Sequence, residues 1–133
     1  MASLFTRIIE RELPGRFVYE DERSVAFLTI APLKPGHTLV VPRTEVDDWL
    51  DLPAGDRAAL FEAAHTVARG VKRAFPCAKV ALMALGLEVP HVHLHLVPID
   101  SEAEANFARA DSTVAPEVLD DVQARIIRAL AEG

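Results

Sequence analysis

Three of the five histidines in this 133-residue chain alternate along one short stretch. His91, His93 and His95 are separated by Val92 and Leu94, which is the two-residue period of a β-strand. On a strand the three imidazoles share one face, about 6.5 Å from one to the next, and the apolar side chains share the other face. Because titratable groups cluster at functional sites, we interpret this stretch as the centre of such a site.

Two kinds of chemistry suit three neighbouring imidazoles. They can bind a divalent metal, as the three-histidine zinc enzymes do. Alternatively, one imidazole can attack an electrophile while its neighbours donate hydrogen bonds to the charge that develops. The histidines alone leave both possibilities open. A metal site would also need groups that orient each imidazole, and the sequence does not identify them.

The elements that position the histidines can be traced from hydrophobic spacing and from Pro and Gly punctuation. Strands are expected at residues 17–20, 25–30, 37–41, 79–85 and 89–99. Helices are expected after the cap Ser3, from about Asp51 to Phe75, and from Pro116 onward. Because strands follow strands at short spacing, we predict an α+β fold: an antiparallel sheet of about five strands, with the long helix packed on it and an extra C-terminal helix. We expect one domain over residues 1–133.

Composition narrows the classes of protein further. The net charge of −6 argues against a protein that binds nucleic acid. No apolar run reaches the roughly 18 residues of a membrane-spanning helix, and the first residues lack the apolar core of a signal peptide. The single cysteine, Cys77, excludes an intramolecular disulfide. We therefore expect a cytoplasmic protein that binds neither nucleic acid nor membrane.

The segment from His91 to Val97 resembles the His-x-His-x-His motif of the histidine triad (HIT) family. Residues 26–32 and 35–42 resemble the other conserved block of that family, and residues 4–9 with Leu13-Pro14 resemble its first helix. The resemblance covers Ser3 to about Ile99 and is closest to the small, dimeric Hint-like branch.

This resemblance implies an activity at phosphorus. Members of the family hydrolyse or transfer a nucleoside monophosphate at its α-phosphate through a covalent nucleotidyl-histidine. By motif position His93 is the nucleophile, His95 and His37 polarise the phosphoryl oxygens, and His91 supports the hydrogen bonding of the site. The resemblance also implies a purine nucleoside monophosphate as the small-molecule partner, a homodimer, and no cofactor.

Further residues are expected to contact the nucleotide. By resemblance, an apolar slot for the base is formed by Phe5, Ile8, Phe27, Leu28 and Ile30, although ordinary core packing explains these residues equally well.

Two segments depart from the family pattern. Thr29 stands where an acidic residue usually holds the ribose hydroxyls, and a hydroxyl cannot offer the paired charged acceptors of a carboxylate. In the loop before the triad, Leu87 occupies the usual Gln position. Glu88 stands where a hydroxyl residue often contacts the phosphate, and its carboxylate would repel a phosphate unless it is protonated or turned away.

A third departure concerns metal binding. Some bacterial members bind structural zinc through two cysteines, a later histidine and one histidine of the triad. The first three of these positions are Ser3, Thr6 and Glu45 here, and only His91 remains, so we expect no metal site.

Three functional hypotheses follow. The first is a nucleotide hydrolase or transferase of the phosphoramidase type that uses His93. The second is a non-catalytic module that binds a nucleotide or phosphometabolite in the same cradle. The third is a metal-dependent hydrolase with the three alternating histidines as ligands.

Overall fold

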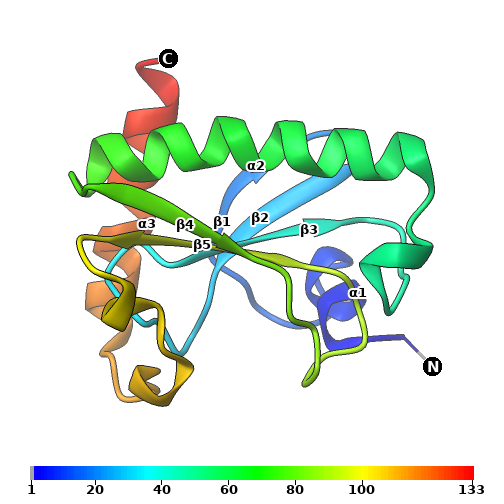
Figure 1. Ribbon diagram of the computed structural model, residues 1–133, viewed down its shortest axis with the longest axis horizontal. Helices are drawn as coiled ribbons and strands as arrows, with labels where there is room; N and C mark the ends of the chain where they lie inside the picture. Colours follow the sequence, from blue (N-terminus) through cyan, green and yellow to red (C-terminus); the bar gives the residue numbers. More distant parts are fainter. Residues whose placement is uncertain (1) are drawn as a thin grey trace.

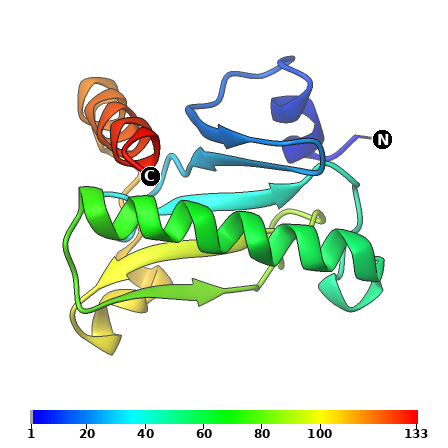
Figure 2. The same cartoon turned by 90° about the horizontal axis from the view of Figure 1, so that it is seen from above.

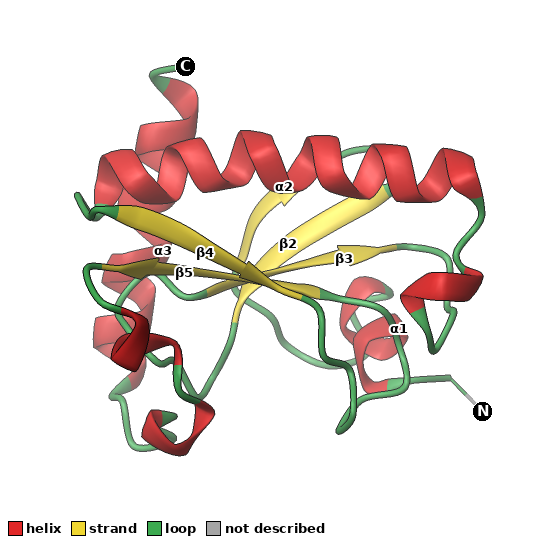
Figure 3. Ribbon diagram, viewed as in Figure 1, coloured by secondary structure: helices red, strands yellow, loops and turns green. Residues whose placement is uncertain are grey.

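The structure is a computed structural model and describes residues 2–133. Its helices and strands are α1 (Leu4–Ile9), β1 (Phe17–Glu20), β2 (Ser24–Leu28), β3 (Thr38–Pro42), α2 (Ala54–Ala74), β4 (Lys79–Met83), β5 (Leu94–Ile99) and α3 (Pro116–Ala131). Three short 3-10 helices complete the order: η1 (Trp49–Asp51), η2 (Glu102–Ala105) and η3 (Phe107–Arg109). Figure 3 shows how these helices and strands are arranged.

The five strands form one antiparallel sheet in the order β1-β2-β3-β5-β4. The long helix α2 covers one face of the sheet, and α1 lies on the opposite face (Figure 1). Helix α3 packs beside α2 and against β1, as the view from above shows (Figure 2). The predicted α+β fold, with its long helix and extra C-terminal helix, is confirmed.

Each face of the sheet has its own hydrophobic core, because successive side chains of a strand point to opposite faces. Alternate residues of β2 illustrate this: Ala26 and Leu28 join the core beneath α2, whereas Val25 and Phe27 join the core beneath α1. The α1 core is small, and its fully buried members are Phe5, Val25, Phe27, Leu39 and Val41. This smaller core packs next to the histidines.

The ends of several elements differ from the sequence expectation. The long helix begins at Ala54, after Pro53, three residues beyond the expected start at about Asp51, which belongs to η1. The strand expected from residue 89 begins only at Leu94. Residues 91–93 are held instead by other backbone bonds: the Val92 N–H donates to the Val46 carbonyl at 2.8 Å. This bond takes the place of pairing with a neighbouring strand, so residues 91–93 are not part of the hydrogen-bonded sheet.

No helix within residues 2–133 is long and apolar enough to cross a membrane.

Candidate active site

The three alternating histidines gather on the α1 face of the sheet, although only His95 lies within β5. The expected alternation holds through the irregular segment, because Val92, Leu94 and Leu96 all enter the core beneath α2. His91 is fully buried and the side chain of His93 is 7% exposed. A fourth histidine, His37, comes from the turn before β3 and is 2% exposed. The structure thus brings all four predicted histidines together.

His91 has a hydrogen-bond partner on each ring nitrogen. Its Nε2 lies 2.8 Å from the carbonyl oxygen of Pro42, and because a carbonyl only accepts, Nε2 carries the proton. Its Nδ1 lies 2.7 Å from the Ser3 hydroxyl and therefore accepts from it. Burial lowers the pKa of His91, so the ring is neutral near pH 7. Both ring nitrogens of His91 are therefore occupied by hydrogen bonds within the protein.

His93 keeps one nitrogen free. Its Nδ1 lies 2.8 Å from the carbonyl oxygen of His91, so Nδ1 donates and Nε2 holds the lone pair. Burial lowers the pKa of His93, and this effect outweighs the opposing influence of the His91 carbonyl and of the Glu88 carboxylate. The result is a neutral imidazole whose Nε2 can act as a nucleophile.

His37 and His95 form a chain of hydrogen bonds that fixes where the protons lie. The backbone N–H of Leu33 donates to His37 Nδ1 at 3.0 Å, so the proton of the neutral His37 ring is on Nε2. That Nε2 donates to His95 Nδ1 at 3.0 Å. The remaining nitrogen of His95, Nε2, must then carry its proton and can donate it to a ligand.

Both rings of this pair are neutral at physiological pH. Burial, followed by the effect of His95, lowers the pKa of His37 to about 3. Burial, followed by the effect of His93, lowers the pKa of His95 to about 4. The rings of His93 and His95 lie 4.9 Å apart, centre to centre. The ring with the free lone pair and the ring with the free N–H donor are therefore neighbours.

Aromatic side chains of the α1 core pack against the ring of His93. Phe5 packs against the His93 ring in a T-shaped arrangement, with centroids 4.8 Å apart and planes at 85°. Phe27 packs against Phe5 in turn, at 5.5 Å, and the partly buried Ile8 packs on the same core. Phe5, Ile8 and Phe27 are therefore close to the nucleophile, and at the same time they are core residues.

The remaining residues expected at the nucleotide are placed differently. Leu28 points to the opposite face of the sheet, into the core beneath α2, because β2 alternates its side chains. It cannot line a slot together with Phe27. Ile30 lies beyond the end of β2 and is 74% exposed, so it is not a core residue.

The two polar residues expected at the nucleotide both lie in loops, Thr29 directly after β2 and Glu88 before the triad. The Thr29 hydroxyl accepts a hydrogen bond from the Ala31 N–H at 3.1 Å. Glu88 is exposed, and its carboxylate acts electrostatically on His93, raising the pKa of that ring against the effect of burial.

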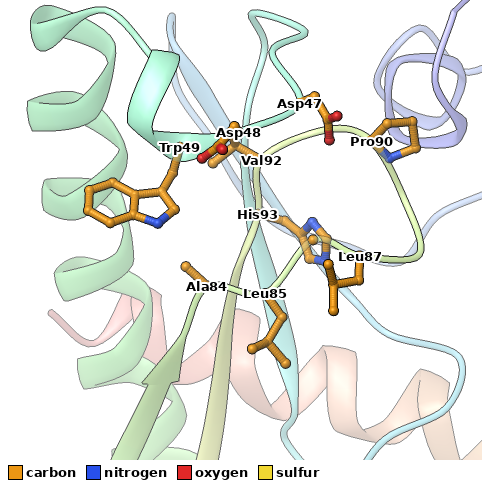
Figure 4. Close-up of a pocket in the computed structure, with 10 residues that line it drawn as sticks. Asp47, Asp48, Trp49, Ala84, Leu85, Leu87, Pro90, Val92 and His93 are labelled. Atoms are coloured by element: carbon orange, nitrogen blue, oxygen red, sulfur yellow. The ribbon is translucent and has the colours of Figure 1, made fainter.

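A cleft of about 360 Å³ opens beside His93. Its lining residues are Asp47, Asp48, Trp49, Ala84, Leu85, Gly86, Leu87, Pro90, Val92 and His93. Figure 4 shows His93 between the segment that carries the two aspartates and the segment that carries Leu85 and Leu87. Both charged residues of the lining are acidic, so the cleft has a negative potential next to the nucleophile.

The sequence interpretation missed the two aspartates and Trp49, since no motif marks them. They lie more than 40 positions from His93 in the chain, and only the path between β3 and α2 brings them to it.

Fold and site together define a small α+β protein with four clustered histidines on one face of its sheet, one of which, His93, has an unoccupied ring nitrogen. A family model described as the HIT domain matches residues 10–102. This chain belongs to the HIT family.

Individual relatives agree with this assignment. The chain is 35% identical over 104 residues to an uncharacterized HIT-like protein of Saccharolobus solfataricus, covering 74% of this chain and 75% of that protein. It is 30% identical over 98 residues to a bis(5'-nucleosyl)-tetraphosphatase of Schizosaccharomyces pombe, covering 70% of this chain and 52% of that enzyme.

Solved structures share the fold over nearly the whole chain. A HIT-like protein of Bartonella henselae superposes with a TM-score of 0.83 at 29% identity, covering 96% of this chain and 95% of that one. A hypothetical histidine triad nucleotide-binding protein of Sulfolobus tokodaii gives 0.81 at 29% identity, with 96% and 91% covered. A Zn-bound histidine triad family protein of Mycobacterium smegmatis gives 0.85 at 25% identity, with 99% and 95% covered.

The residues at the family's zinc position do not fit a zinc ion. The Ser3 N–H and the Thr6 hydroxyl both donate to Oε1 of Glu45, each at 2.6 Å, and these bonds lower the pKa of Glu45 to about 2. The Ser3 hydroxyl occupies Nδ1 of His91. Structural zinc prefers thiolate and imidazole ligands, whereas this cluster offers hydroxyls already bonded to one another. Within residues 2–133, no group of three or more His, Cys, Asp or Glu side chains is arranged to hold a metal ion.

Proposed function

We propose that this protein is a nucleotide hydrolase or nucleotidyl transferase that acts at the α-phosphate of a nucleoside phosphoramidate or a related nucleotide. One observation carries the proposal. His93 donates its Nδ1 proton to the His91 carbonyl, which leaves Nε2 as a free lone pair beside the Nε2–H of His95. A nucleophile and an electrophilic donor side by side are what substitution at a phosphoryl group requires.

In the first step, Nε2 of His93 forms a bond to the α-phosphorus as the bond to the leaving group breaks. The attacking ring becomes positively charged, and its Nδ1–H, already donated to the His91 carbonyl, stabilises that charge. The Nε2–H of His95 donates to a phosphoryl oxygen, and the leaving group takes its proton from water. Water then displaces His93 from phosphorus and gives its proton to the hydroxide left by the first step, which releases the nucleoside monophosphate and restores the neutral ring.

Two relatives support a nucleotide as the substrate. The Sulfolobus tokodaii structure is described as a nucleotide-binding protein, and the Schizosaccharomyces pombe relative is named as a tetraphosphatase of bis-nucleosyl compounds. For this chain we propose a purine nucleoside monophosphate moiety whose base packs near Phe5, Ile8, Phe27 and Ile30. Thr29 would then offer a single hydroxyl to the ribose.

The decisive experiment is to trap the covalent intermediate. Wild-type protein mixed with an adenosine 5'-phosphoramidate and quenched in base should carry an acid-labile adenylyl group on His93, located by mass spectrometry. His93→Ala should form no adduct and lose turnover, whereas His65→Ala, which removes an exposed histidine of α2, should behave like wild type. Equal turnover by wild type and His93→Ala would refute the proposal.

The same experiment separates the other two hypotheses. Nucleotide affinity without adduct or turnover would indicate a non-catalytic binding module. A metal-dependent hydrolase would lose turnover with a chelator and regain it with the metal. The hydrogen bonds on both nitrogens of His91 argue against that third mechanism, because His91 has no nitrogen left for a metal.

We also propose that the protein is a cytoplasmic homodimer. Strand β4 is an edge strand of the sheet, and unpaired edges invite pairing with a second chain. Exposed apolar side chains surround it, namely Leu82, Leu85, Phe61 and Trp49. Light scattering on the purified protein should give twice the chain mass, and Leu82→Lys on the edge should halve it.

A further inference from the structure

Near the end of the family-matched range, the chain folds back over the face of the sheet that carries the histidines. We call residues 101–111, which contain η2 and η3, the strap. The strap and α1 both lie on the side of the sheet opposite α2 (Figure 1). We propose that Phe107, in the strap, is a positioning residue for the His95–His37 pair.

The strap is anchored at two points to the loop before His37. Lys34 and Glu104 form an ion pair of 2.7 Å whose side chains are only 27% and 19% exposed. Toward the other end, the Asp111 N–H donates to the Pro32 carbonyl at 3.1 Å. Because both anchors belong to residues 32–34, the strap and the turn that carries His37 are held as one unit.

Local capping bonds then determine where Phe107 lies. The Asn106 side chain accepts from the Ala108 N–H at 2.9 Å and so caps η3, which begins at Phe107. The other oxygen of Glu104 accepts from the Asp100 and Ser101 N–H groups, at 2.6 and 3.3 Å. The position of this aromatic side chain is therefore set by the backbone on either side of it.

Phe107 packs against both rings of the pair. Its centroid lies 4.9 Å from that of His95, with the planes at 78°, and 6.3 Å from that of His37, with the planes at 72°. These are the T-shaped arrangements that aromatic rings prefer. Phe107 is itself 37% exposed, so it lies between the histidine pair and solvent.

This placement affects which nitrogen of His95 carries the proton. The neutral ring of His95 offers its Nε2–H to a ligand only while its Nδ1 accepts from His37, and this bond also fixes the orientation of the ring. Protonation of His95 would place a second N–H against the Nε2–H of His37 and break that bond. An apolar cover disfavours the charged ring and excludes water that could replace His37 as donor. The titratable group that faces the pair is His93, whose ring lies beside that of His95, and the charged groups that anchor the strap, Lys34 and Glu104, are paired with each other.

Imidazole NMR tests this directly, without any substrate. In the wild-type protein, nitrogen-detected spectra should show His95 as a single neutral tautomer protonated at Nε2, with a pKa near 4. In Phe107→Ala the pKa of His95 should rise by at least one unit toward its ordinary value near 6.5, and both nitrogens should share the proton. Phe107→Tyr keeps the ring and should keep the wild-type spectrum, as should the control Ile127→Ala on the exposed face of α3.

A second variant guards against a folding defect. Lys34→Met removes one anchor of the strap and leaves Phe107 in the chain, and it should raise the pKa of His95 in the same direction. An unchanged titration and tautomer of His95 in folded Phe107→Ala would overturn the proposal, as would equal changes in Phe107→Ala and Ile127→Ala.

Kinetics supply a second readout, and this part alone rests on the proposed function. At pH 5, kcat for a nucleoside phosphoramidate should fall about twofold in Phe107→Ala if the pKa of His95 rises by one unit from about 4, and about tenfold if it rises by two units, with little change in KM. The reason is that the neutral fraction of the ring falls from about nine-tenths to about one-half or one-tenth. Phe107→Tyr should restore kcat. If the wild-type protein turns over no nucleotide, the proposed function fails while the NMR result still decides the role of Phe107.

Discussion

Replacing Ser3 with alanine should destabilise the protein and loosen His91. The side chain of Ser3 is buried, and its hydroxyl makes two short hydrogen bonds that bear on the fold, whereas the other hydroxyl near His91 Nδ1, that of Thr6, lies farther away at 3.4 Å. It accepts from the Thr6 N–H at 3.0 Å, which caps α1, and it donates to Nδ1 of His91 at 2.7 Å. The hydroxyl thus links the first helix to the histidine whose carbonyl holds His93.

The size of the effect follows from these two bonds. Loss of an N-cap side chain costs about 1 kcal/mol. A buried acceptor left without a good donor costs about 1–3 kcal/mol, and His91 Nδ1 would keep only the long contact of 3.4 Å to the Thr6 hydroxyl. We therefore expect Ser3→Ala to lower the free energy of unfolding by about 2–4 kcal/mol. Urea denaturation followed by circular dichroism measures this, provided that the slope with denaturant stays constant.

The matched control is Thr6→Val. It removes the more exposed hydroxyl bond to Glu45 and leaves the Ser3 cap and its bond to His91 in place. It should cost less than Ser3→Ala by at least about 1 kcal/mol. A loss below about 0.5 kcal/mol in Ser3→Ala, or equal losses in the two variants, would show that the buried bond to His91 contributes no stability and that our reasoning is wrong.

Three further predictions concern pH, charge and backbone conformation. The pKa values of about 3 for His37 and about 4 for His95 lie below the value of 6.5 in the unfolded chain. Between pH 6.5 and 4 the unfolded chain therefore binds more protons than the folded protein. The melting temperature, measured by calorimetry, should fall as the pH is lowered through that window. Replacing Asp47 and Asp48 together with asparagine should raise kcat/KM for nucleotide substrates about two- to fivefold at low salt, because two negative charges leave the cleft beside His93. Gly36→Ala should destabilise by about 1–3 kcal/mol in urea, since its φ is +101° and a Cβ would lie 2.9 Å from the Phe75 ring.

Each of these has a control in the same chain. For pH, His37→Asn should reduce the loss of stability between pH 6.5 and 4, and an unchanged loss would contradict the assignment to His37. For charge, Asp51→Asn lies outside the cleft lining and should leave kcat/KM unchanged; an equal gain there would point to net charge alone. For backbone conformation, Gly55→Ala places its Cβ only against the flexible end of Arg23 and should cost much less than Gly36→Ala.

The sequence predicted the elements well because their signals are local. The apolar stripe of the long helix and the Ser3 cap each occupy a short window, and both elements appear where they were expected. The boundary of β5 was wrong because strand limits depend on partners elsewhere in the chain. Val92 bonds to Val46, and no local pattern reveals that pairing.

For the candidate site as well, local signals could be read from the sequence and long-range contacts could not. The alternation of His91, His93 and His95 was readable from the sequence, since side-chain direction along extended backbone depends only on position. The same rule places Leu28 on the opposite face of the sheet from Phe27. The predicted base slot, which included both residues, did not take this alternation into account.

The sequence by itself therefore predicted the fold class and the four histidines that gather at the site, and its motif is the basis for proposing His93 as the nucleophile. Only the tertiary structure decided which nitrogen of each ring carries the proton, because the partners that decide it come from distant segments: the Pro42 carbonyl, the Leu33 N–H and the Ser3 hydroxyl. The same holds for the acidic cleft and for Phe107, which reach the histidines through the folding of separate loops. Hydrogen bonding and burial act through space, and a linear pattern records only what is near along the chain.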